Sequence, residues 1–366
     1  MLVMQRLSNF VRRGHQITLV SPDPCHYYSG MGPGLLGGSY RPKDTYVHVA
    51  RMVQERGGAF AQDLAVRIDT VNRRLQLASG AELDYDVLSC NVGSEVPGGS
   101  EASDGAFLFG PKLVPVKPIV NLARVRENLL ALTSKEPMRL AVVGGGAAGC
   151  EVAGNLRRLL NEIPRQGQID LFTGGKLLNR FSPKVERAVR QNFSKRSISV
   201  RTEKVIGGAD GVLRLSDQSE QHYDLTVLST GVQPPALFAA SGLTLGADGG
   251  MAVNRYLQSL DAPEIFGGGD CICFAHNPLP KVGVHAVRQN PILLHNLMAA
   301  LEGQPLKAYR PQKQCLLALN LGDGSGVLQW RRWVVSGRLA FRFKDWLDRS
   351  FMRRFQVSGV LEASRR

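Results

Sequence analysis

This sequence has little cysteine and no long apolar run. Its six cysteines are scattered without a framework spacing, and no close redox pair such as C-x-x-x-x-C occurs. We also expect no secretory leader. No apolar run approaches the ~20 residues that a membrane-spanning helix needs. Hydrophobic residues make up 43% of the 366 positions and charged residues 21%, which is typical of a globular protein large enough for two domains. We therefore expect a cytoplasmic location with reduced thiols.

Acidic residues are also in deficit. The chain has 31 Asp and Glu against 45 Lys and Arg, a net charge of +14. Half of this excess follows Trp330, where ten Lys and Arg stand against three acidic residues. A basic end of this kind suits nucleic acid, an anionic membrane surface or a solvated face. No nucleic-acid motif accompanies the charge, so we expect no nucleic-acid partner, and no metal site is predicted.

Strand-like and helical runs alternate along most of the chain, which favours a parallel α/β architecture. Long helices are predicted at 121–134 and 284–301. The predicted strands are 17–20, 87–90, 140–143, 169–172, 225–229 and 264–266.

The most informative segment is the glycine-rich stretch that begins at Gly144. Gly144, Gly146 and Gly149 have the G-x-G-x-x-G spacing, between the apolar run 140–143 and the helix-forming run 151–160. The first glycine allows a tight turn, the second lets the backbone approach a pyrophosphate, and the third lets helix and strand pack closely. We prefer a dinucleotide site to a plain strand–helix turn, because the motif has this context.

Several further segments carry a family resemblance. Segments 86–94 and 224–232 both read Asp, apolar strand, small residues, Gly, and 265–270 reads Ile-Phe-Gly-Gly-Gly-Asp. Segment 286–289 reads Ala-Val-Arg-Gln, and 27–34 is rich in Tyr and Gly. Together they resemble the FAD-dependent pyridine nucleotide–disulfide oxidoreductase superfamily. Within it the chain is most similar to type II NADH:quinone dehydrogenases and sulfide:quinone oxidoreductases, including a subgroup sometimes fused to selenide, water dikinase.

The resemblance implies two Rossmann-like domains, the second inserted in the first. Residues 1–119 and 250–310 would bind FAD, 120–249 would bind NAD(P)H, and 311–366 would form a small α+β membrane or interface region. The first strand and glycine loop of the FAD domain are missing. Two explanations stay open: that translation starts further upstream, or that the protein is degenerate and binds FAD weakly.

The family implies that NAD(P)H reduces FAD and that a quinone-type acceptor takes the electrons. A sulfide-dependent reaction without NAD(P)H is the alternative enzyme, and a non-catalytic nucleotide-binding protein is the alternative from another class. The strand 169–172 ends in Thr173, where NAD-dependent enzymes have Glu or Asp. Lys176 or Arg180 could attract the 2′-phosphate of NADPH, or nicotinamide use has been lost; both readings stay open. A homodimer also stays open.

The resemblance assigns five further residues to cofactor binding. Asp270 would bind the ribityl chain, although Asp is also common as a helix N-cap. Gly269 would let the flavin approach, and Gly93 and Gly231 would end the two paired strand segments. Ser21 stands where the family has an acidic residue for the adenosine ribose, so Asp23 is only a substitute.

The resemblance also suggests residues near the reacting groups. Glu151 would lie near the nicotinamide and relay protons, although an acidic first-turn residue is equally ordinary. Gln289 and Ala286 would border the flavin and the quinone. His285 could donate a proton, and Lys117 could place positive charge near the flavin. A structural histidine and a solvated turn lysine are the competing interpretations.

The segment 344–357 is amphipathic if it is helical. Leu347, Phe351 and Phe355 repeat at four-residue steps, and Lys344 and nearby arginines supply charge. This composition suits a helix at an anionic membrane surface, as the family resemblance also implies. The cysteines read as small buried thiols, although a sulfide-oxidising pair built from distant cysteines stays open.

Overall fold

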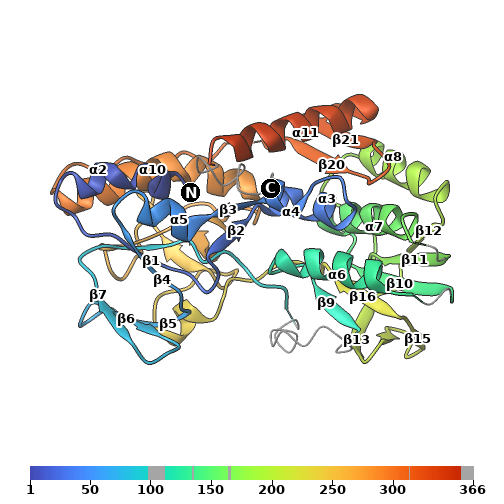
Figure 1. Cartoon of the computed structure of the whole chain (residues 1–366), viewed down its shortest axis with the longest axis horizontal. Helices are drawn as coiled ribbons and strands as arrows, with labels where there is room; N and C mark the ends of the chain where they lie inside the picture. Colours follow the sequence, from blue (N-terminus) through green and yellow to red (C-terminus); the bar gives the residue numbers. More distant parts are fainter. Residues whose placement is uncertain (98–111, 134–135, 164–165, 313, 356–366) are drawn as a thin grey trace.

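The structure is a computed structural model that describes residues 1–97, 112–133, 136–163, 166–312 and 314–355. Two α/β units lie side by side, and the helix α11 (Arg338–Arg353) crosses one side of the molecule above α3 (Gly32–Leu36) and α4 (Pro42–Thr45) (Figure 1). Within these residues, no helix has the length and apolarity needed to cross a membrane. The α/β class predicted from the alternating pattern is confirmed.

The unit that carries the glycine motif has one continuous parallel sheet. Its strand order is β12-β11-β10-β16-β9, so that β10 pairs with β11 on one edge and with β16 on the other. These strands lie within one or two residues of the predicted ones where a prediction was made. The bounds are β9 Leu113–Pro115, β10 Met138–Val143, β11 Gly167–Phe172, β12 Ile198–Arg201 and β16 Leu225–Leu228.

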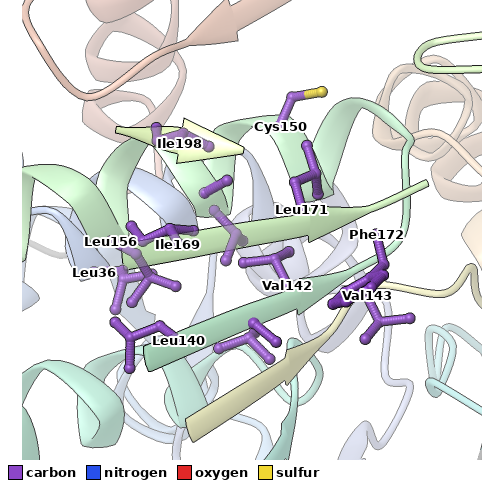
Figure 2. Packing of buried hydrophobic residues seen from close by; sticks show 14 of the residues in the cluster. Leu36, Leu140, Val142, Val143, Cys150, Leu156, Ile169, Leu171, Phe172 and Ile198 are labelled. Carbon is purple, nitrogen blue, oxygen red and sulfur yellow. The ribbon is translucent and has the colours of Figure 1, made fainter. Parts of the chain in front are cut away.

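Helices cover this sheet and close its core. Leu140 and Val142 of β10 and Ile169 and Leu171 of β11 are fully buried, and Leu156 of α7 packs on them (Figure 2). A parallel sheet between helices is expected to show such continuous apolar strands. The helices are α6 Val120–Ala131, α7 Ala147–Leu160 and α8 Pro183–Ser194, and the hairpin strands β13 Val205–Ala209, β14 Val212–Leu215 and β15 Glu220–His222 extend the unit.

The other unit divides its parallel strands among separate pairs. β1 pairs with β4, β18 with β8, and β17 with β19. The strands are β1 Thr18–Val20, β4 Ala59–Ala61, β8 Leu88–Cys90, β17 Met251–Val253, β18 Ile265–Gly267 and β19 Ile272–Phe274. The helices α1 Leu2–Gln5, α2 Leu7–Val11, α5 Val49–Gln54, α9 Leu237–Ala240 and α10 Gly283–Leu301 pack around them, with β2 Cys25–Tyr27, β3 Tyr46–His48 and the sheet β5 Ala65–Asp69, β6 Arg74–Leu77 and β7 Glu82–Asp84.

The C-terminal part of the chain packs on the glycine-motif unit. An antiparallel sheet of β20 Leu317–Asn320, β21 Gly326–Trp330 and β22 Trp333–Gly337 leads into α11. β9 lies inside the range 1–119 expected for the FAD unit, yet it extends the other sheet through its pairing with β16. Residues 356–366 of the predicted C-terminal region lie outside the described residues.

Candidate functional site

The glycine turn has the geometry that its spacing predicts. A Cβ atom on Gly144, whose φ is +132°, would collide with the Ser229 carbonyl oxygen, and one on Gly149 would collide with the Gly144 carbonyl oxygen. No atom lies within 4 Å of the position that a Cβ on Gly146 would take. Gly144 and Gly149 are therefore required by packing, whereas Gly146 leaves its backbone open to a ligand at the start of α7.

Asp270 lies in a short turn directly after β18 and is the centre of a polar group. Its Oδ2 accepts a hydrogen bond of 2.9 Å from Lys117 Nζ and one of 2.8 Å from Ser94 Oγ. Lys117 Nζ also donates to Ser94 Oγ at 2.5 Å. The structure thus brings together two predicted residues, Asp270 and Lys117. Ser94 was missed, although it directly follows the predicted Gly93.

Helix α10 supports the backbone of the same turn. Gln289 is 1% exposed, and its Oε1 accepts a hydrogen bond of 2.7 Å from the Gly269 N–H. Gly269 has a φ of +80°, and the Ala286 methyl group lies 3.4 Å from the position of a Cβ there. Gln289 is therefore a residue that positions the turn, and Gly269 is needed for its left-handed backbone.

His285 lies one turn before Gln289 on α10. It is 5% exposed, and its Nδ1 lies 3.2 Å from the Tyr309 hydroxyl. Burial lowers the pKa of His285, against the opposing charge of Asp270. The neutral imidazole is therefore favoured, held by Tyr309.

The remaining predicted cofactor-binding residues lie in turns. Asp23 Oδ1 accepts a hydrogen bond of 2.7 Å from the Cys25 N–H, so one carboxylate oxygen stabilises its own loop. Gly93 and Gly231 have φ values of +74° and +107°, and no atom lies within 4 Å of a Cβ built on either of them. Both glycines therefore allow a backbone conformation that other residues rarely adopt.

Glu151 lies in the first turns of α7 and belongs to a buried cluster that also includes Lys344 and Asp348 of α11. Lys344 Nζ lies 2.7 Å from Asp348 Oδ2 and 3.7 Å from Glu151 Oε1, and it donates a hydrogen bond of 2.9 Å to the Gly30 carbonyl oxygen. The Asn320 N–H donates a hydrogen bond of 2.7 Å to Glu151 Oε1. Lys344 and Asp348 are each 4% exposed. Two carboxylates therefore share one ammonium away from solvent.

This arrangement shifts the protonation of both carboxylates. Burial raises the pKa of Glu151 to about 7, against the attraction of Lys344. Burial also raises the pKa of Asp348, to which the Tyr28 hydroxyl donates a hydrogen bond. Burial alone would lower the pKa of Lys344, but the two carboxylates leave it raised. The cluster can thus hold a proton near neutral pH on Glu151.

The segment 29–36 contacts the buried cluster. Gly30 binds Lys344 through its carbonyl oxygen, and a Cβ on Gly32 would lie 3.0 Å from Ile119. This segment therefore packs between α11 and the residues around Ile119.

The burial pattern of helix α11 differs from the one predicted for the amphipathic segment 344–357. Ala340, Lys344, Asp348 and Met352, spaced by four residues, form its buried stripe. The prediction that Lys344 adds to an exposed basic face is wrong, because Glu151 and Asp348 compensate its charge inside the protein. The exposed apolar residues of the C-terminal region are Trp330 (46% exposed), Trp333 (69%), Val335 (52%), Leu339 (73%), Phe343 (43%), Trp346 (57%) and Leu347 (40%).

The predicted aromatic residues at the end of α11 pack inward. Phe351 stacks on Tyr28 with ring centroids 4.6 Å apart, and Phe355 is only 8% exposed. Of the three residues predicted for the apolar face, only Leu347 is on the exposed surface. Alternation of charge and apolar residues identified a helix with two faces but not which face is inside. Gln356 and Val357 of the predicted segment lie outside the described residues.

Four of the six cysteines have the buried environment that the simpler interpretation predicts, whereas Cys25 and Cys315 are partly exposed. Cys90, Cys150, Cys271 and Cys273 are at most 5% exposed. Burial raises the pKa of Cys271 to about 11 and raises the pKa values of Cys90 and Cys150 as well. The thiolate, which is the nucleophilic form, is therefore disfavoured at these positions.

Known proteins resemble this chain over most of its length. The model of a family described as pyridine nucleotide-disulphide oxidoreductase matches residues 3–290. Ferroptosis suppressor protein 1 of Taeniopygia guttata is 28% identical over 296 residues, which are 77% of this chain and 74% of that protein. Demethylphylloquinone reductase NdbB of Synechocystis sp. is 26% identical over 320 residues, 81% of this chain and 76% of that protein.

A solved structure shows the same fold. The sulfide:quinone oxidoreductase of Aquifex aeolicus superposes with a TM-score of 0.76 and 19% sequence identity, over 99% of this chain and 91% of that chain. The expected fold class of two Rossmann-like units is thereby confirmed.

Proposed function

The chain belongs to the pyridine nucleotide-disulphide oxidoreductase family, and from this premise we propose that it is an FAD-dependent oxidoreductase that passes electrons from NAD(P)H to a quinone-type acceptor. The observation that carries the proposal is the pairing of an open dinucleotide turn at Gly146 with the largely buried, proton-holding Glu151 five residues later. Reduction of a quinone to a quinol consumes protons as well as electrons, so a proton donor near neutral pH suits this reaction.

The residues of the Asp270 group fit FAD. The Asp270 carboxylate is held by Ser94 and Lys117 at the glycine turn after β18, where it could bind a ribityl hydroxyl. Gln289 fixes the Gly269 N–H of this turn. When bound, FAD supplies the hydride and electron chemistry that no amino-acid side chain provides. The task of the protein is then to orient the nucleotide and to supply protons.

Glu151 is our candidate for the proton donor. In its protonated form it can give a proton to the reduced acceptor, and Lys344 then stabilises the remaining carboxylate. Asp348, which accepts a hydrogen bond from the Tyr28 hydroxyl, holds the ammonium in place. A donor whose pKa lies near the working pH combines a populated acid form with easy proton release.

The exposed apolar surface of the C-terminal region supports peripheral membrane docking. Leu339, Phe343 and Trp346 lie on the side of α11 that faces away from its buried stripe, with exposed arginines beside them. A surface of exposed aromatic residues next to basic ones suits the boundary between lipid headgroups and acyl chains. Docking there would bring the enzyme to a lipid-soluble quinone.

Vesicle binding tests the docking. We expect sedimentation with vesicles of phosphatidylglycerol and phosphatidylcholine, and a loss of at least about tenfold in partitioning when Leu339 and Trp346 are replaced by serine. Leu260→Ser is the matched control, because Leu260 is 52% exposed in the other unit. Equal losses in both variants would contradict docking through α11.

Anaerobic spectroscopy tests the reaction itself. We expect the purified protein reconstituted with FAD to show a flavin absorbance band that bleaches on addition of NADH or NADPH and returns on addition of a short-chain quinone. A band that sulfide bleaches and neither nucleotide affects would favour the sulfide-dependent alternative. The raised thiol pKa values of the buried cysteines argue against that alternative.

A further inference from the structure

The carboxyl ends of β11 and β12 form a basic surface where a bound dinucleotide places its adenosine ribose. From this surface we infer that the protein selects NADPH over NADH, and that Lys204 and Lys176 hold the 2′-phosphate. The inference rests on the proposed function, because it concerns the nucleotide that would reduce the flavin. It is carried by three independent observations on Thr173, on the lysines and on the nearby carboxylates.

Thr173 stands at the end of β11, and its hydroxyl is engaged by the backbone. Its Oγ1 lies 2.5 Å from the Gly175 carbonyl oxygen and 3.1 Å from the Arg201 carbonyl oxygen, so its single proton is used within the loop. The Thr173 side chain also packs against Gly145 of the glycine turn. A neutral group in this position neither accepts hydrogen bonds from both ribose hydroxyls nor repels a phosphate, whereas an acidic residue would do both.

Two exposed lysines approach this loop from separate segments. Lys204 follows β12 by three residues, and its Cγ lies 3.8 Å from the position of a Cβ on Gly174. Lys176 lies two residues further along the same loop, and its Nζ is 3.9 Å from Glu186 Oε2. Gly174 and Gly175, with φ values of +59° and +141°, give the loop a backbone path that keeps these lysines beside it. Lysine is an effective point charge for phosphate.

The nearby carboxylates are already compensated. Asp170 is 8% exposed and accepts a hydrogen bond of 2.8 Å from the Tyr223 hydroxyl. Glu203 accepts bonds of 2.9 and 2.7 Å from Arg201. Glu186 has Arg190 at 3.0 Å in addition to Lys176. Among the described ion pairs, Lys204 has no carboxylate partner, so its charge is available to an anion.

Arg180, which the sequence also suggested for the phosphate, faces a different space. It lines a cavity of about 730 Å³ together with Arg331, Arg332 and Trp333 of the C-terminal hairpin. The inference therefore assigns the 2′-phosphate to Lys204 and Lys176 and leaves Arg180 out.

Calorimetric titration tests the inference without any turnover. We expect the protein to bind NADP⁺ about tenfold more tightly than NAD⁺, since each lysine would form a charge-assisted hydrogen bond with the 2′-phosphate. The double variant Lys176→Ala/Lys204→Ala should lose this preference and keep its affinity for NAD⁺. Lys195→Ala is the matched control, because Lys195 is exposed but precedes β12, at the amino ends of the strands instead of their carboxyl ends.

Two results would overturn the inference. One is tighter binding of NAD⁺ by the wild type, together with a loss of NAD⁺ affinity in Glu203→Gln, which would make Glu203 the ribose acceptor. The other is an unchanged NADP⁺ affinity in the double lysine variant. If NADP⁺ is preferred but NADPH leaves the flavin band unchanged, the proposed function fails and the binding assignment stands. If NADH bleaches the band and NAD⁺ binds more tightly, only the nucleotide preference fails.

Discussion

The two α/β units of this protein differ in how their strands are joined. In the unit around Gly144, β10 pairs with a neighbour on both edges, and five parallel strands form one sheet. In the unit around Asp270, β1–β4 and β8–β18 are separate two-stranded sheets. The first unit therefore carries its ligand site on a hydrogen-bonded frame. The second positions Asp270 through side-chain contacts with Ser94 and Lys117 and through helix α10.

The difference shows two ways to fix a ligand-binding turn. At the glycine turn, the carbonyl oxygens of Ser229 and Gly144 leave no room for a Cβ on Gly144 and Gly149, so backbone packing fixes the geometry. At Asp270, the partners come from positions more than 150 residues away along the chain. The first kind of site tolerates few substitutions at its glycines, and the second depends on several remote residues that each contribute modestly.

The largest effect should come from Gly149→Ala in the continuous sheet. The new methyl group would collide with the Gly144 carbonyl oxygen, and backbone cannot yield as a flexible side chain can, so we expect a loss of more than about 4 kcal/mol of unfolding free energy. Urea denaturation followed by circular dichroism measures it.

Gly146→Ala is the matched control for this variant, because its Cβ would meet open space. We expect its unfolding free energy to stay within about 0.5 kcal/mol of the wild type, while its nucleotide affinity falls. Equal destabilisation by both alanines would show that the turn is not fixed by packing.

Lys344→Met should have the next largest effect, at the contact between the two units. The methionine fills a similar volume but leaves Glu151 and Asp348 without the ammonium between them. Removing one partner of a buried ion pair typically costs about 3–5 kcal/mol, measured again by urea denaturation. Arg349→Met, on the same helix but partly exposed and paired with Asp345, should cost less than about 1 kcal/mol. A cost for Lys344→Met as small as this control would contradict the buried cluster.

Features that depend on residues close together in the sequence could be predicted, whereas contacts between residues far apart in the sequence could not. The predicted strands and α7 follow from apolar runs and the glycine spacing. The partner of Glu151 could not be found in this way, because Lys344 lies 193 residues later and a lysine on an amphipathic helix is usually solvated. Its only local signal is the spacing Ala340, Lys344, Asp348, Met352, which places a charge pair between two inward residues.

Asp270 and Lys117 were each predicted as site residues, but the contact between them was not predicted. Each residue was identified from the family resemblance, but their direct contact and the part of Ser94 depend on the arrangement of separate segments. The divided sheet also escaped prediction, because strand-forming runs are similar in both units. Pairing between strands depends on which segments are neighbours in space, and the separations along this chain are long.

Asp270→Ala should weaken the divided unit's site without unfolding it. Loss of the carboxylate removes the group that would bind the ribityl chain and leaves Lys117 and Ser94 to bind each other. We expect FAD affinity to fall at least about tenfold, as for the loss of one hydrogen bond to a charged group, with a small change in unfolding free energy. Flavin fluorescence titration measures the affinity. Asp261→Ala, an exposed aspartate of the same unit, serves as the control and should leave FAD affinity unchanged.

Glu151→Gln should change how stability depends on pH. The folded protein raises the pKa of Glu151 from an ordinary 4.5 to about 7, so the fold favours the protonated form. The contribution of this group is therefore fully present below about pH 4.5 and is lost as the pH rises to about 7. The unfolding free energy of the wild type, relative to Glu151→Gln, should fall between these two pH values. A difference that is independent of pH would show that Glu151 is ionised throughout.

Hydrogen exchange should reveal the smallest difference and tests the comparison of the two units directly. Amides of β10 and β11 lie inside a continuous ladder, whereas among the described residues β1 has a strand partner, β4, on only one edge. Each missing backbone hydrogen bond removes on the order of 1 kcal/mol of net stabilisation, so local opening of β1 should require about that much less free energy. Mass spectrometry of the apo protein measures both sets of peptides in one experiment. Bound FAD should reduce this difference in opening free energy, since a ligand that binds the native state stabilises the segments it contacts. An equal difference with FAD bound would mean that the ligand does not stabilise the strands of the divided unit.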